Sequence, residues 1–303
     1  MTVLIILAIA VLIFAVARSS ARSKSGRSTA APRRPYATPE SRPAEPPRAP
    51  NTFSHSRLEK FEKCPKAYEF RYIKNMPESF GTIEMFLGRA VHSTLEWAYA
   101  ERDRRGAPPC SKELDTHFQA LWAAGNSQEM RVVKKAMSVG TYNAQGMEML
   151  KRFERRILAG DKTQTIALEK QFRMVLSGGA AFTGVIDRLA RDEAGMVYVI
   201  DYKTGSSRNV KGPSQSRQLQ VYGAWAAEDQ GAARIGLRVE DMQGERTLAH
   251  TWTTASRSTL ISSLETQIAE VGRARKFPAL ISPLCGWCGY RPHCSAGRAS
   301  WGA

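Results

Sequence analysis

The chain has 303 residues, of which 43% are hydrophobic and 9% aromatic, and its formal net charge is +16. This length and composition suit one substantial globular domain with appendages, and so basic a chain suggests a polyanionic partner, either nucleic acid or an anionic membrane surface. The five cysteines are odd in number and unevenly spaced, which argues against a secreted disulfide framework.

The N-terminal segment is apolar and is followed by positive charge. Residues 2–17 carry no charge, and Arg18 begins a series of basic residues. A spanning helix usually needs about 20 apolar residues, but a shorter run can span if its flanking side chains snorkel. The charges follow the run, unlike those of a signal peptide, and they favour a cytoplasmic location for the remaining chain. We therefore predict a membrane anchor at residues 1–17 that tethers a cytoplasmic protein to the inner face of the membrane; a spurious or buried extension is the alternative.

Residues 18–51 are rich in Pro, Ser, Ala and Arg and contain almost no large apolar side chain. Such a segment buries too little surface to offset the entropy of ordering, so it is predicted to be a disordered linker. The folded domain is therefore expected to comprise residues 52–303.

The first half of this domain has helical periodicity. Apolar residues recur at helical spacing over residues 54–73, with a capping box expected at Ser56 and Glu59 and a break expected at Cys64-Pro65. Further helices are predicted at residues 84–103, 111–124 and 128–159.

The second half changes to strand patterns. Strands are predicted at residues 165–176, 181–192, 196–204, 233–240 and 246–253, and helices at residues 215–229 and 256–275. The combination of a helical half with a sheet and an intervening helix predicts an α/β domain.

Two acidic residues end short apolar runs within adjacent predicted strands. Residues 192–195 have the composition of a tight hairpin turn, which would place Asp187 and Asp201 at neighbouring positions. Lys203 lies two residues beyond Asp201 and therefore on the same face of the strand. Two acids and a lysine can bind a divalent cation and hold an attacking water, although many such sequences are solvated surface pairs.

Other polar side chains are candidates for the same site. His92 follows Gly88-Arg89-Ala90-Val91 and is a candidate third metal ligand, although a lone helical histidine is more often packed or solvated. Gln218 and Tyr222 are four residues apart on one helix face, where they could contact a phosphate or base; a polar helix surface is the alternative.

The cysteines suggest a second site. Cys285, Cys288 and Cys294 are closely spaced, and Cys64 beside Pro65 is the best candidate for a fourth ligand. Four cysteines can bind Zn²⁺ or an iron–sulfur cluster, and His293 makes a Cys3His zinc site a competitor. Cys110 has no partner spacing and is interpreted as incidental.

The order CP, GRAVH, GVID, VIDYKTG, QLQVY and CxxCx5C, over roughly residues 54–296, resembles the RecB-like branch of the PD-(D/E)XK nuclease superfamily. It is most similar to the compact iron–sulfur exonucleases related to the CRISPR-associated RecB-like nucleases and to the AddAB nuclease domain. The resemblance implies a restriction-endonuclease-like core, in which helices flank a central mixed sheet, with a helical N-terminal half. It also implies a Cys-rich C-terminal loop that closes on the first helix.

Roles follow from the resemblance by position. It implies that His92, Asp187, Asp201 and the Tyr202 carbonyl bind Mg²⁺ or Mn²⁺, and that Lys203 orients or activates the attacking water. It further implies positioning of the DNA strand by Gln218 and Tyr222, and a [4Fe–4S] cluster on Cys64, Cys285, Cys288 and Cys294. Glu169 matches no motif of the family, and assistance to a second metal is a hypothesis.

The expected activity is that of a metal-dependent DNA exonuclease, which hydrolyses phosphodiester bonds of single-stranded DNA or DNA ends in repair, recombination or phage/CRISPR-type processing. A helicase or recombination partner is also expected. Five basic residues are predicted to line a channel for the strand: Arg89, Lys134, Lys135, Arg155 and Arg156. The alternatives are a non-catalytic DNA-binding or scaffold protein and a membrane-tethered adaptor.

Overall fold

The computed structural model describes residues 51–125 and 129–300. The predicted anchor at residues 1–17, and all of the predicted linker except residue 51, lie outside these residues. Within the described part of the chain, no helix is both long and apolar enough to cross a membrane.

A six-stranded mixed sheet forms the centre of the domain. The strands are β1 (Thr52–Phe53), β2 (Gln164–Val175), β3 (Ala181–Arg191), β4 (Val197–Lys203), β5 (Arg234–Asp241) and β6 (Arg246–Thr253). Their order is β1-β3-β4-β5-β6, with β2 paired to β3. The β1–β3 and β4–β5 pairs are parallel and the other pairs are antiparallel.

Strand β3 is the branch point of the sheet. One of its edges pairs with β2 over nearly its whole length. Along the other edge, β1 pairs with residues 181–182 and β4 with residues 188–191. Residues 183–186 of β3 therefore pair with β2 alone and Asp187 lies outside both registers, which opens a gap in the sheet immediately before Arg188.

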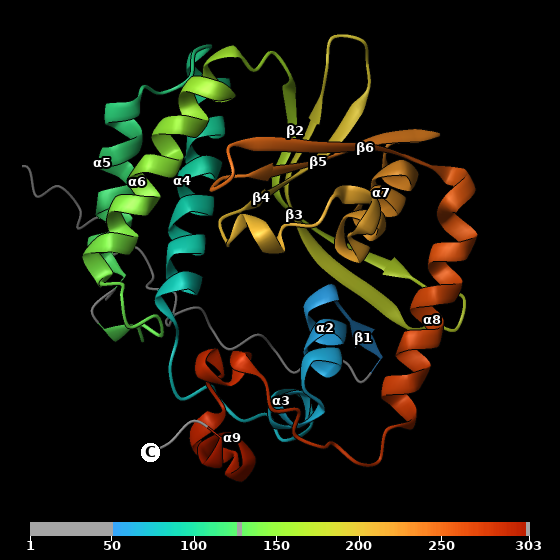
Figure 1. Ribbon diagram of the computed structural model, residues 1–303. Helices are drawn as coiled ribbons and strands as arrows, with labels where there is room; N and C mark the ends of the chain where they lie inside the picture. The colour runs from blue at the N-terminus through green and yellow to red at the C-terminus, as the bar shows by residue number, and fades with distance from the viewer. Residues whose placement is uncertain (1–50, 126–128, 301–303) are drawn as a thin grey trace, which may run out of the picture. The chain divides into compact units, whose positions relative to one another are not determined.

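Helices cover both faces of the sheet (Figure 1). On one face pack α4 (Ile83–Arg105), α5 (Ser111–Ala124) and α6 (Val139–Arg156), and on the other lie α7 (Arg217–Asp229) and α8 (Arg257–Arg273). The alternation of β4 explains the two layers, because Tyr198, Ile200 and Tyr202 face the first group whereas Val197 and Val199 face the second. The predicted mixed sheet flanked by helices is confirmed.

Short helices complete the domain: α2 (His55–Lys63), α3 (Pro65–Tyr68) and α9 (Ser295–Ala299). The expected break at Cys64-Pro65 is confirmed, since Cys64 is extended and Pro65 occupies the first turn of α3. The turn at residues 192–195 is also confirmed, with Gly195 at a φ of 84°.

Two predictions about helix starts were wrong. The helix predicted at residues 128–159 begins only at Val139, because the Ser138 hydroxyl accepts a hydrogen bond from the Thr141 N–H and caps the helix there. The helix near residue 55 is capped by Ser54 rather than Ser56, since Ser54 is the extended residue that leaves β1, and its hydroxyl accepts from the Arg57 N–H.

Candidate active site

Asp187 and Asp201 lie where β4 separates from β3. The last paired residues are Arg188 and Ile200, so the two aspartates would form the next pair in that register. The Tyr202 N–H instead donates to the Asp187 carboxylate over 2.8 Å. The Asp187 side chain therefore accepts the hydrogen bond that a main-chain carbonyl of β3 would accept in a continuous ladder. This contact holds the Asp187 carboxylate at the gap.

Helix α4 contributes His92 to this gap. Its Nε2 atom lies 2.8 Å from the Tyr202 carbonyl oxygen, and its Nδ1 atom lies 3.5 Å from Asp187 Oδ2. Burial by itself lowers the pKa of His92, but the Asp187 charge, followed by those of Asp201 and Glu169, outweighs burial and raises this pKa to about 9. At neutral pH the imidazole is therefore protonated and supplies positive charge where the acidic residues meet.

Glu169 on β2 joins the same group. Ligand atoms of His92, Glu169 and Asp187 all lie within 4.8 Å of one another, the one such group of three among residues 51–125 and 129–300. Glu169 adopts a φ of 44°, a left-handed conformation that costs a residue other than glycine about 1–2 kcal/mol. The sequence motifs gave Glu169 no fixed role, because its position depends on how β2 pairs with β3.

A polar chain connects β4 to α7. Lys203 Nζ lies 2.8 Å from Asp201 Oδ2 and donates to Gln218 Oε1 over 3.0 Å. Gln218 Nε2 then donates to the Tyr222 hydroxyl over 2.9 Å. The structure thus brings Asp201, Lys203, Gln218 and Tyr222 together, while the Asp201 carboxylate faces Lys203 and lies outside the group of three around His92.

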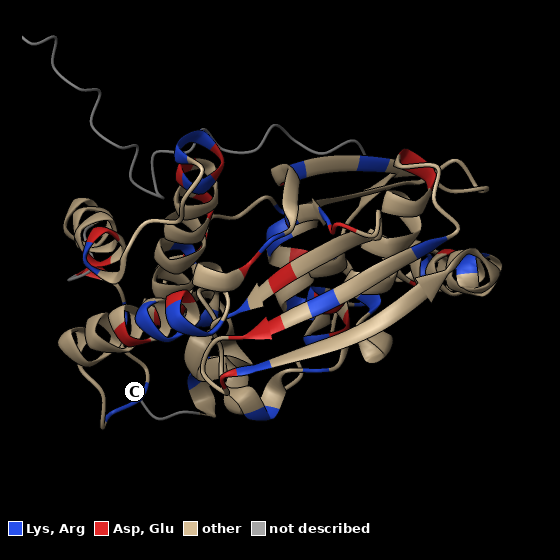
Figure 2. Cartoon of the chain, turned by 90° about the horizontal axis from the view of Figure 1, so that it is seen from above, with Lys and Arg blue, Asp and Glu red and all other residues tan. Residues whose placement is uncertain are grey.

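The pKa values of the two aspartates differ in direction. Burial, and after it the charge of Asp187, raises the pKa of Asp201 against the opposing effect of Lys203. Burial also disfavours the charged form of Asp187, but His92, the Tyr202 N–H and Lys203 hold the pKa of Asp187 below its ordinary value. Acidic and basic positions lie side by side on the strands (Figure 2). The surface of the sheet is therefore not uniformly positive, and positive side chains alone do not make it a phosphate-binding surface.

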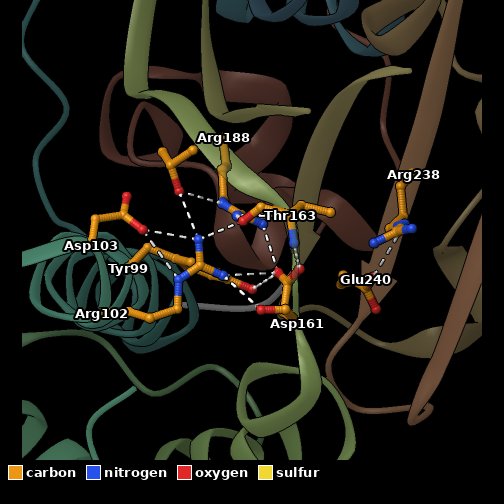
Figure 3. Close-up of polar contacts among 9 residues, drawn as sticks. Tyr99, Arg102, Asp103, Asp161, Thr163, Arg188, Arg238 and Glu240 are labelled. Carbon is orange, nitrogen blue, oxygen red and sulfur yellow. Dashed lines mark hydrogen bonds and ion pairs between the residues drawn. The ribbon is translucent and has the colours of Figure 1, made fainter. Parts of the chain in front are cut away.

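A buried polar network fixes α4 against β3 beside the site (Figure 3). Arg188, which has no exposed surface, donates to Asp161 over 2.9 Å, and its guanidinium lies 3.7 Å from the centre of the Tyr99 ring. Tyr99 donates to the same aspartate over 3.0 Å, and Arg102 lies 3.5 Å from it. The network therefore joins α4, which carries His92, to β3, which carries Asp187. The sequence patterns did not predict this network. The one feature of the sequence that could have indicated it is Arg188, a charged residue at an inward-facing position of a predicted strand.

The four cysteines predicted to act together line one small cavity of about 30 Å³. Cys64 comes from the junction of α2 and α3, and Cys285, Cys288 and Cys294 from the C-terminal segment, so that segment does close on the first helices. His293 does not line the cavity and instead lies 3.0 Å from the Ser79 hydroxyl. Cys110 is exposed at the start of α5.

The basic residues predicted to line a channel are dispersed. Lys134 and Lys135 are exposed in the segment before α6. Arg156 is engaged with Glu240 at 3.2 Å. Lys134 and Lys135 therefore remain available to a polyanion, whereas Arg156 has a protein partner.

Comparison with known proteins identifies the family. Residues 52–295 match the family model of the PD-(D/E)XK nuclease superfamily, and no curated protein matches the chain. A solved structure titled "Crystal structure of SSO0001" is 13% identical, covers 82% of this chain and 88% of its own, and has a TM-score of 0.34. Proteins of the matched superfamily are generally hydrolytic nucleases that act on DNA and use Mg²⁺ or Mn²⁺. The chain belongs to the PD-(D/E)XK nuclease superfamily.

Proposed function

We propose that this chain is a metal-dependent DNA exonuclease of the RecB-like branch, acting on single strands or DNA ends in repair, recombination or phage/CRISPR-type processing. The observation that carries the proposal is the convergence of His92 from α4, Asp187 from β3, and Asp201 and Lys203 from β4. These are the residue types that metal-assisted hydrolysis of a phosphodiester needs.

The donor atoms fit a hard divalent cation. His92, Glu169 and Asp187 present ligand atoms within 4.8 Å of one another, and carboxylate and carbonyl oxygens suit Mg²⁺ or Mn²⁺. In the proposal, His92, Asp187, Asp201 and the Tyr202 carbonyl hold the ion, with Glu169 as an additional carboxylate. When bound, the ion would lower the pKa of a water and offset the negative charge that develops on the phosphate.

Lys203 is suited to orient the attacking water and to complement the developing charge. Burial by itself lowers the pKa of Lys203, but Asp201 outweighs it, and this pKa is raised above the ordinary value. Lys203 therefore stays protonated and acts as a cationic donor rather than as a base. Its hydrogen bond to Gln218, which in turn donates to Tyr222, fixes the direction of the ammonium group.

For the cysteine site we propose a [4Fe–4S] cluster on Cys64, Cys285, Cys288 and Cys294. A tetrahedral zinc–thiolate site with Zn–S bonds of about 2.3 Å would hold its sulfurs roughly 3.8 Å apart. Among residues 51–125 and 129–300, no three of these thiols gather within 4.8 Å, which favours the wider spacing of a cluster over Zn²⁺. A cluster there would tie α2 and α3 to the C-terminal segment.

We also propose that residues 52–303 form the nuclease domain, with residues 1–17 as a membrane anchor and residues 18–51 as its linker. A helicase or recombination partner would then meet the enzyme at the inner face of the membrane. The anchor would be refuted if the full chain were fully active when prepared without detergent and if none of it were found in the membrane fraction of cells.

The test is digestion of end-labelled single-stranded, double-stranded and circular DNA by the full chain with Mn²⁺, Mg²⁺ or EDTA. Asp187→Asn and Lys203→Met should each reduce cleavage at least about a thousandfold. Glu193→Gln, a change of an exposed acid in the turn between β3 and β4, is the matched control and should cleave normally.

Cleavage of linear but not circular strands would support an exonuclease. A protein that binds oligonucleotides but shortens none under any metal condition would favour the non-catalytic scaffold instead.

A further inference from the structure

A groove of about 670 Å³ lies beside the candidate active site. Gln218 and Tyr222 form part of its lining, and Gln218 also accepts the hydrogen bond from Lys203. The groove is therefore continuous with the residues that would act on the phosphate, yet none of the residues that line it belongs to the group around His92.

The floor of the groove is the part of β3 that pairs with β2 alone. Thr183 and Val185 line it, and Arg173 lines it from the facing position on β2. Val185 is 38% exposed, an uncommon state for a valine in the middle of a central strand. The gap between β1 and β4 thus leaves apolar and polar surface open to a ligand.

The charge of the groove is suited to a polyanion. None of the residues that line it is acidic, and Arg173 is exposed within it. Its remaining wall is the amino end of α2, whose first turn contains no acidic residue. The amino end of a helix carries partial positive charge, and here it adds to that of Arg173. The nearest acid on this wall is Glu59, which does not line the groove but lies 4.0 Å from His55, whereas Glu169 and Asp187 lie in the group around His92.

Two side chains in the lining have hydrogen-bonding capacity that the protein does not use. The Tyr222 hydroxyl, on a side chain that is almost fully buried, accepts a hydrogen bond from Gln218, which leaves its own hydrogen to donate to a ligand in the groove. His55 Nδ1 is buried and has no hydrogen-bond partner among residues 51–125 and 129–300. Burial, assisted by Arg217 and Lys203, lowers the pKa of His55 to about 4, so its ring is neutral at pH 7 and can hydrogen-bond or stack with a base.

We propose that this groove binds one or two unpaired nucleotides next to the scissile phosphodiester, and so makes single-stranded DNA the substrate. Its volume falls in the range of about 300–1,000 Å³ that is typical of pockets for small ligands, which suits unpaired nucleotides and not a duplex. Proteins bind single strands without sequence preference through positively charged grooves that also present aromatic side chains to the bases, and Phe172 and Tyr222 belong to the lining of this groove. This inference rests on the proposed function, because the scissile phosphodiester would lie at the proposed metal site beside the groove.

Substitutions in the full chain test the groove. Val185→Trp would fill it, and Arg173→Glu would reverse its charge. Val175→Trp and Arg234→Glu are the matched controls, since both are exposed strand residues outside the groove, with Val175 at 58% exposure.

Two readouts separate the groove from the chemistry. One is the dissociation constant of a fluorescent ten-nucleotide oligothymidine, measured by anisotropy in EDTA. The other is the ratio of kcat/KM for the same oligonucleotide to kcat/KM for bis(4-nitrophenyl) phosphate. This diester is too small to occupy the groove and the proposed metal site at the same time.

We expect each groove variant to weaken oligonucleotide binding about tenfold and to lower the kinetic ratio to a similar extent, with the controls unchanged. We also expect the parent to bind a blunt duplex at least about tenfold more weakly than the single strand. Groove variants that bind like their controls, or a parent that binds the blunt duplex equally well, would overturn the inference. Absent hydrolysis of both substrates by the parent would instead refute the proposed function, and the binding measurement would still decide the groove.

Discussion

We predict that Mg²⁺ binding at the proposed site depends strongly on pH, because His92 is protonated in the metal-free protein. In the metal-free protein, Nδ1 lies 3.5 Å from Asp187 Oδ2 and Nε2 lies 2.8 Å from the Tyr202 carbonyl, so both ring nitrogens act as donors toward atoms that a cation would need. A cation that uses His92 as a ligand must therefore displace a proton. With the pKa of His92 raised to about 9, roughly one molecule in a hundred has a neutral ring at pH 7.

The expected size of the effect follows from that fraction. The apparent affinity for Mg²⁺ should rise about fiftyfold between pH 7 and 9 and level off near the pKa, which over this range is about 2.3 kcal/mol. Each ion bound at pH 7 should release close to one proton. Calorimetric titration of Mg²⁺ in buffers of different ionisation enthalpy measures both quantities.

His92→Gln is the control, because a side chain that does not titrate should bind the ion more weakly and with little dependence on pH. An affinity of the parent protein that stays flat from pH 7 to 9, with no proton released, would refute the reasoning.

Four further predictions concern stability and the second site. In thermal unfolding, the metal-free protein should lose up to about 3 kcal/mol of unfolding free energy as the pH rises from 6.5 through 9. The reason is that the interactions that raise the pKa of His92 stabilise the fold only while the ring is protonated, so a flat profile would contradict this. Glu169→Gly should relieve left-handed strain, so that urea unfolding shows no loss of metal-free stability, while Mg²⁺ affinity falls at least about tenfold; loss of stability with intact affinity would reverse the interpretation. Arg188→Met should cost about 3 kcal/mol in urea unfolding, because it removes a charge partner from a buried aspartate; a cost below about 1 kcal/mol would show that the network is not needed. Cys64→Ser should abolish the iron content and the broad visible absorption of anaerobically purified protein, whereas Cys110→Ser should preserve both; stoichiometric zinc without iron would decide for the alternative.

Much of the sheet could be predicted because its signals are local. Strand alternation placed Asp201 and Lys203 on one face, and the structure joins them at 2.8 Å. The composition of residues 192–195 predicted the turn that pairs β3 with β4. These features need only neighbours in the chain and the period of two.

Other features depend on long-range packing and could not be read from the sequence. Glu169 joins His92 and Asp187 through the register of β2 on β3 and a left-handed backbone at that residue. The network around Arg188 requires α4 to lie against β3, and the groove exists because β1 and β4 leave a gap along β3. Cys64 was already the best candidate for the fourth ligand from its place beside Pro65, but its proximity to the distant cysteines depends on the packing of the C-terminal segment against the first helices.

The most direct test of the account is anomalous diffraction from crystals of the protein soaked in Mn²⁺. We predict one strong anomalous peak within about 2.3 Å of ligand atoms from both His92 and Asp187, with the Tyr202 carbonyl also coordinated and the imidazole no longer hydrogen-bonded to it. An empty gap between β3 and β4 at millimolar Mn²⁺, or a peak bound elsewhere while these side chains keep their present contacts, would contradict it.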